Sequence, residues 1–92
     1  MYIRDADSTF FIKEFYICSD GSGKGWVYAV PVNENSLQLF YGDIDKANEF
    51  YEFVLSVIAR GENLISIDEL QGRFDSVQSV TKAVKSLFGR GA

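Results

Sequence analysis

The first 41 residues alternate between segments rich in aromatic and β-branched side chains and short turn segments. Three segments have the composition of strands, at about 9–18, 26–32 and 37–41. The links at 19–25 and 33–36 hold Gly, Asp, Asn and Ser, and both are too short for a parallel crossover, which takes about a dozen residues. The pattern therefore predicts a three-stranded antiparallel meander, which a short strand near the N-terminus would extend.

A helix is predicted to follow over residues 43–60. Apolar residues recur there at three- and four-residue spacing, which places them on one side of a helix. Asp43 or Asp45 is placed to cap the first turn, and Gly61 is a typical C-terminal stop. Because an apolar side needs a surface to cover, we expect this helix to pack on one face of the meander.

The C-terminal region predicts one or two further helices. A Ser-x-x-Glu capping box starts at Ser66 and opens a helix over 67–74. Gly72 favours a break before a second helix over 77–88, although the spacing of the apolar residues also fits one continuous helix. The chain has room for one hydrophobic core, so residues 1–92 are predicted to form a single α+β domain.

The composition excludes several kinds of active site. The chain has no His and one Cys, which removes the commonest general base, the commonest metal ligand, a Cys–His dyad and an intrachain disulfide. Cys18 is predicted to be a half-buried strand residue. The loop from Gly21 to Gly25 resembles a phosphate-binding loop, but a strand rather than a helix follows it. We therefore expect a protein that is not an enzyme and that uses no cofactor and no metal.

The charge is distributed unevenly along the chain. Residues 1–70 carry twelve acidic and five basic side chains, a net charge of −7, whereas residues 71–92 have a net charge of +3. Within the acidic part, Asp45, Glu49 and Glu52 lie on one face of the predicted helix. Such a row resembles a line of phosphates and suits a basic groove of a protein that handles nucleic acid. The alternative is an ordinary solvated helix face.

The predicted strands are rich in aromatic side chains. Simple alternation along the first strand places Phe11, Phe15 and Ile17 on one face and Phe10, Ile12, Tyr16 and Cys18 on the other. Proteins that stack bases on a sheet surround the rings with positive charge, whereas Lys13 and Lys24 alternate here with acidic residues. We expect most of these rings to pack in the core. A ring that is exposed instead would indicate a protein interface. The rings concerned are Tyr16, Trp26, Tyr28, Phe40 and Tyr41.

Residues 66–88 partly resemble a helix-turn-helix, which gives an alternative function as a small DNA-binding regulator. Basic side chains would reach phosphates in that case. The segment departs from the pattern because its turn is a residue short and Gln71 occupies a position that is usually small. A helical hairpin packed on the sheet is the simpler interpretation. The residues of the alternative nucleic-acid site are Arg73, Lys82, Lys85 and Arg90.

In size, acidity, absence of His and lack of an enzymatic motif, the chain resembles the small inhibitors made by phages and mobile elements, anti-CRISPR proteins among them. The resemblance implies a cytoplasmic protein in a bacterial host that docks on a nucleic-acid-guided complex and blocks its nucleic-acid path. Neither a membrane nor a small-molecule substrate is expected as a partner. Carboxylates of the helix over 43–60 would contact Lys or Arg of the partner, so charge reversal at Glu49 and Glu52 is expected to weaken binding. The predicted partner-binding residues are Asp43, Asp45, Glu49, Glu52 and Trp26.

Overall fold

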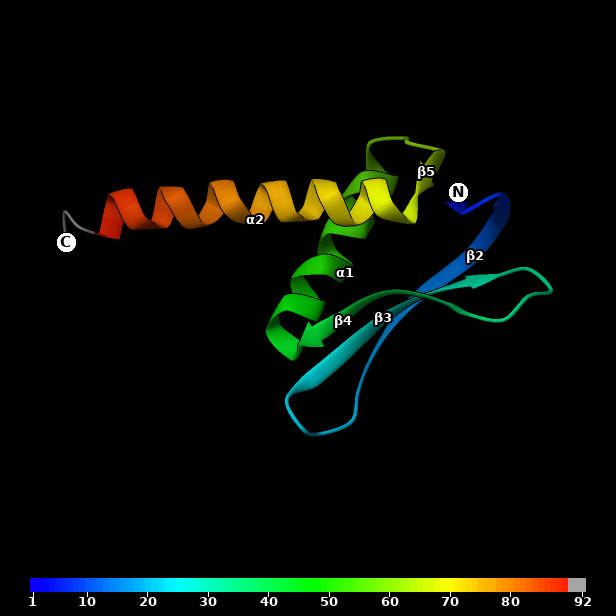
Figure 1. Ribbon diagram of the computed structural model, residues 1–92, viewed down its shortest axis with the longest axis horizontal. Coiled ribbons are helices and arrows are strands. Elements are labelled where there is room, and N and C mark those ends of the chain that lie inside the picture. Colours follow the sequence, from blue (N-terminus) through cyan, green and yellow to red (C-terminus); the bar gives the residue numbers. More distant parts are fainter. Residues whose placement is uncertain (90–92) are drawn as a thin grey trace.

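A five-stranded sheet and two helices make up the described part of the chain (Figure 1). The computed structural model describes the backbone of residues 1–89 and the side chains of residues 1–80. The class is α+β, as predicted. In chain order the elements are β1 (Tyr2–Asp5), β2 (Ser8–Ser19), β3 (Lys24–Pro31), β4 (Leu37–Asp43), α1 (Ile44–Ala59), β5 (Leu64–Ser66) and α2 (Ile67–Gly89).

The sheet has the strand order β4-β3-β2-β1-β5. The predicted meander is confirmed as β2, β3 and β4, and the short N-terminal strand is β1, paired antiparallel with β2. The strand β5 was missed by the sequence analysis. It pairs parallel with β1, with Ile3 opposite Ile65, which makes the sheet mixed. Three residues are too few for a periodic signal, so only the long-range pairing defines this strand.

The alternation predicted for the first strand is wrong beyond Ile12. The register against β3 shifts between Ile12 and Glu14, which marks a β-bulge. A one-residue insertion moves every later side chain to the other face of the sheet. Phe15 and Ile17 therefore join Ile12 on the side of the core. Cys18, predicted to be half-buried, is exposed.

The helix α1 packs directly on β3 and β4. A Cβ atom at Gly25 would lie 2.6 Å from Ile44 Cδ1 and 3.0 Å from Ala47 Cβ, so the start of the helix approaches β3 closely at this glycine. Farther along α1, the Phe50 ring stacks on Phe40 of β4, with 5.1 Å between the ring centres. These contacts place α1 on the face of the sheet that Gly25 and Phe40 share.

The ends of α1 lie within one residue of the predicted 43–60. Gly61 ends the helix as predicted, with a φ of +85° and an N–H that donates to the Ile58 carbonyl at 2.9 Å. Asp43 occupies the N-cap position, but its side chain makes no capping hydrogen bond. Of the two residues predicted to cap the helix, Asp43 therefore does not do so through its carboxylate, and Asp45 lies in the first turn.

The helix α2 is one continuous helix, so the predicted break at Gly72 is wrong. The Glu69 N–H donates to the Ser66 hydroxyl at 3.1 Å, which confirms Ser66 as the cap. The Ser76 hydroxyl donates to the Gly72 carbonyl at 3.1 Å, so it is satisfied within α2 and does not cap a new helix. Because α2 is a single helix without an internal turn, the predicted helix-turn-helix and the predicted helical hairpin are both wrong.

The first part of α2 contacts the body of the protein. Leu70 and Phe74 are buried, and the Phe74 ring centre lies 5.1 Å from that of Phe50. The Gln71 amide donates to the Leu39 carbonyl at 2.7 Å. Farther on, α2 runs along the longest axis of the molecule and projects past the other elements (Figure 1).

Gly72→Ala is expected to raise the free energy of unfolding by about 0.5–1 kcal/mol. A Cβ atom at Gly72 would have no neighbour within 4 Å, and Ala favours a helix over Gly. Urea unfolding followed by circular dichroism measures the change. The matched control is Gly61→Ala, which is expected to be destabilising because Gly61 has a positive φ. A loss of stability in Gly72→Ala would contradict a continuous α2.

Candidate functional site

The face of the sheet opposite α1 and α2, called the open face below, carries a set of aromatic side chains. Residues alternate between the two faces along a strand, so Trp26 points away from α1 while its neighbours Gly25 and Val27 lie beneath the helix. The same argument places Tyr2 of β1 opposite the buried Ile3. The aromatic residues of the open face are Tyr2, Phe11, Tyr16, Trp26, Tyr28 and Tyr41.

These residues form three cross-strand pairs, each made by direct register partners. Side chains directly opposite each other on neighbouring strands lie close enough for their rings to touch. This contact restricts the orientation of each ring. The ring centres lie 5.1 to 5.2 Å apart in every pair. The pairs are Tyr2 with Phe11, Tyr16 with Tyr28, and Trp26 with Tyr41.

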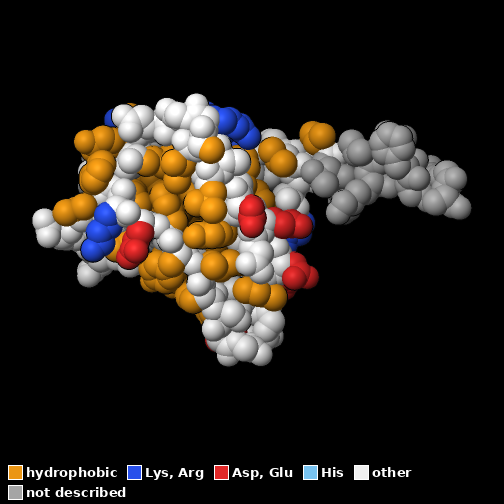
Figure 2. Space-filling model, turned by 180° about the vertical axis from the view of Figure 1, so that it is seen from behind, with side chains coloured by type: hydrophobic (Ala, Val, Ile, Leu, Met, Phe, Trp, Pro, Cys, Tyr) orange, Lys and Arg blue, Asp and Glu red, His pale blue; other side chains and the backbone are white. Residues whose placement is uncertain are grey.

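The open face exposes much of this aromatic surface to solvent. The exposed fractions are 42% for Tyr2, 50% for Phe11, 39% for Tyr16 and 51% for Tyr41. Leu64 of β5 lies beside Tyr2 in the register and is also exposed. Hydrophobic side chains cover much of the molecular surface in the view of Figure 2. Exposed aromatic side chains gathered on one face of a sheet are typical of interaction sites in soluble proteins.

The interpretation of most rings as core is therefore wrong. Of the five rings considered, Phe40 alone stacks within the core, where it contacts Phe50 and Phe74. Trp26 and Tyr28 are half-buried through contact with their neighbours on the sheet. The structure also adds Tyr2 and Phe11, which the sequence analysis did not consider as site residues.

An ion pair borders the open face where β3 begins and β4 ends. Lys24 Nζ lies 2.7 Å from Asp43 Oδ1, and the two residues are register partners. The hydrogen bond and charge of Lys24 lower the pKa of the Asp43 carboxyl, and Asp43 in turn raises the pKa of Lys24. In the adjoining loop, the Ser22 hydroxyl and N–H donate to Asp20 and lower the pKa of that carboxyl.

Lys24→Gln is expected to raise the pKa of Asp43 toward its ordinary value, because the substitution removes the first cause of the lowering. A pH titration of the carboxyl carbon by NMR measures this change. Since the folded pKa of Asp43 is lowered, the pair stabilises the fold above the unfolded pKa of Asp and loses that effect as the pH falls through the folded pKa. An unchanged Asp43 titration in Lys24→Gln would contradict the ion pair.

The predicted carboxylate row lies on α1, away from the open face. Asp45, Glu49 and Glu52 are all exposed, and Lys46 Nζ lies 3.5 Å from the Glu49 carboxylate. Several acidic side chains lie near one another on the side of the surface toward the grey segment in Figure 2, and another lies beside a basic side chain on the opposite side. The structure thus separates the predicted partner-binding residues. Trp26 belongs to the open face and Asp43 borders it, whereas Asp45, Glu49 and Glu52 form a different surface on α1.

Arg73, predicted as a nucleic-acid contact, is held by two carboxylates. Its Nη1 lies 2.5 Å from Glu62 Oε1 and its Nη2 lies 2.7 Å from Glu69 Oε1. Both hydrogen bonds raise the pKa of the guanidinium. The charge of Arg73 is therefore engaged within the protein. The side chains of Lys82 and Lys85, and the whole of Arg90, lie outside the described residues.

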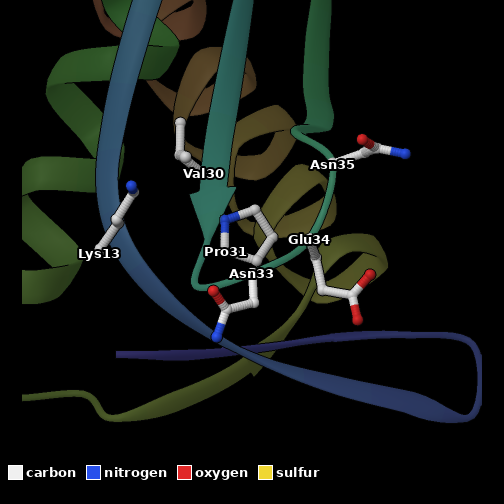
Figure 3. Close-up of a pocket in the computed structure, with 6 residues that line it drawn as sticks. All are labelled: Lys13, Val30, Pro31, Asn33, Glu34 and Asn35. Atoms are coloured by element: carbon white, nitrogen blue, oxygen red, sulfur yellow. The ribbon is translucent and has the colours of Figure 1, made fainter.

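A shallow hollow lies where β3 leads into the loop before β4 (Figure 3). Lys13, Val30, Pro31, Asn33, Glu34 and Asn35 line it. Figure 3 shows Glu34 and Asn35 pointing away from Lys13, so their polar groups do not converge on one point. Within residues 1–80, no three His, Cys, Asp or Glu side chains gather in a way that would hold a metal ion. No helix of the described part is long and apolar enough to cross a membrane.

Comparison of the chain with protein-family models, curated proteins and solved structures found no match.

Proposed function

We propose that the protein is a non-enzymatic inhibitor that binds another protein through the open face. The observation that carries the proposal is the set of three exposed aromatic pairs spread across β1 to β4. Tyr and Trp are enriched among the residues that dominate binding energy at protein interfaces. Each ring of the open face is held by a partner on the next strand, so little side-chain freedom is lost when a partner covers it.

The charges around the open face favour a protein over a nucleic acid. A platform that stacks bases needs a positive groove for the phosphate backbone. Here the charge of Lys24 is offset by Asp43, the exposed Lys13 on β2 has the exposed Glu14 beside it, and the chain as a whole has a net charge of −4. The rings therefore lie on a protein that repels phosphates, which supports an apolar protein surface with a basic rim as the partner.

The proposed target is a complex that handles nucleic acid, with a CRISPR effector as the specific candidate. The nucleic-acid path of such a complex is basic, so an acidic protein is attracted to it. A bound inhibitor of 10.3 kDa occupies that path and blocks it sterically. This proposal keeps the expectation drawn from the resemblance and moves the anchoring contacts from α1 to the open face.

A pull-down from bacterial lysate, with and without nuclease and at low and high salt, tests the proposal. We expect a defined complex that resists nuclease treatment, and we expect the purified complex to lose nucleic-acid binding when the protein is added. Recovery of nucleic acid that nuclease and high salt abolish would contradict it. So would a retained complex that binds its nucleic acid equally well with the inhibitor present.

A further inference from the structure

The C-terminal part of α2, residues 77–89, forms a segment that we call the α2 arm. It spans about 20 Å at the rise of an α-helix. The contact nearest its root is a hydrogen bond between Lys46 on α1 and Gln78. The apolar side chains described beyond Phe74 are exposed, with 46% for Val77 and 64% for Val80. The two apolar side chains described at the start of the arm are thus left uncovered by the body of the protein.

A helical segment of this length is marginally stable in water without a packing surface. The apolar spacing seen at Val77 and Val80 continues in the sequence with Val84, Leu87 and Phe88. Apolar residues at three- and four-residue spacing are typical of one side of a helix that packs against another helix. The spacing of these apolar residues therefore indicates that another helix packs along the arm.

We propose that this partner is the α2 arm of a second copy of the chain, in antiparallel orientation. In a two-fold pair, the end of each arm lies beside the root of the other. The root adjoins α1, because Lys46 contacts Gln78 and lies 3.5 Å from the Glu49 carboxylate. Antiparallel pairing therefore brings the end of one arm close to the acidic row of the other copy.

The charges of the two regions are complementary. Residues 71–92 have a net charge of +3, whereas residues 1–70 have a net charge of −7. Within the acidic part, the exposed residues Asp45, Glu49 and Glu52 follow one another along α1. The two-fold pair thus places the basic end of each chain against the acidic part of the other, which a parallel pair of arms does not do.

This proposal is independent of the proposed function, because it rests on α2 and α1 rather than on the open face. Sedimentation equilibrium of the full chain, from micromolar to millimolar concentration and at low and high salt, tests it. We expect a dimer whose dissociation constant rises with salt. Val77→Asp combined with Val80→Asp is expected to raise that constant more than about tenfold, because it places charges in the apolar contact.

The matched control is Ser76→Asp combined with Ser79→Asp, which adds the same charge at the same spacing on exposed polar positions of α2. We expect the control to change the dissociation constant less than about threefold. Tryptophan fluorescence confirms that the body of each variant is folded. A monomer over the whole concentration range would overturn the proposal. A dimer that Tyr41→Ser dissolves while the Val77 and Val80 double variant retains it would overturn it as well, because it would place self-association on the open face.

Discussion

Phe50→Ala is expected to lower the free energy of unfolding by about 3–5 kcal/mol. Phe50 is fully buried, and its ring centre lies 5.1 Å from those of both Phe40 and Phe74. It therefore joins α1, β4 and α2 at one point of the core. Domains of this kind have a total stability of about 5–15 kcal/mol, so the loss is a large share of the whole. Urea unfolding followed by circular dichroism measures it.

The matched control for Phe50→Ala is Phe11→Ala on the open face. Phe11 is 50% exposed and contacts mainly Tyr2, so we expect a loss of no more than about 1.5 kcal/mol. This comparison separates the two faces of the sheet with the same substitution. A loss at Phe11 equal to that at Phe50 would show that the open face is packed against something within the folded chain.

The second large effect concerns binding. Tyr16→Ser combined with Tyr41→Ser is expected to weaken binding to the complex recovered in the pull-down by more than about 30-fold, the effect of losing interface residues worth about 2 kcal/mol or more. The two rings belong to different pairs, with Tyr28 and Trp26 as their neighbours. Both are partly exposed, so their removal leaves the core intact. Titration calorimetry with the purified complex gives the change in affinity.

Leu55→Ser is the matched control for this double variant. Leu55 is 42% exposed, close to the exposure of Tyr16, but it lies on α1 on the other side of the sheet. We expect its affinity to stay within about threefold of that of the unchanged protein. If Leu55→Ser weakened binding as strongly as the open-face variant, the contact would lie on α1.

The elements that local patterns define were predicted well. The three strands of the meander follow from β-branched and aromatic runs between turns, and α1 follows from its apolar spacing and from Gly61. The parts that depend on distant contacts were not. Neither the parallel pairing of β5 with β1 nor the bulge after Ile12 leaves a signal in the local sequence. Each depends on the pairing of strands that are distant in the sequence. Gly72 does not break α2, although glycine disfavours a helix, and a Cβ atom at this position would face open space.

The candidate site was predicted only in part. Trp26 and Asp43 lie on or beside the open face, as the sequence grouped them, but Asp45, Glu49 and Glu52 belong to another surface. The open face could have been predicted by comparing the number of helices that can cover the sheet with the number of aromatic residues in its strands. The helix α1 and the first part of α2 cover a single face of the sheet, while aromatic residues make up 15% of the chain and occupy both faces. Rings on the second face must then meet solvent or a partner.

Oxidative footprinting of the free protein and of its complex tests the central claim most directly, because it reports the solvent exposure of individual aromatic side chains. We expect Tyr16, Trp26 and Tyr41 to lose reactivity when the complex forms, while Tyr51 on α1 keeps its own. Protection of Tyr51 with unchanged reactivity of the three open-face rings would contradict binding through the open face.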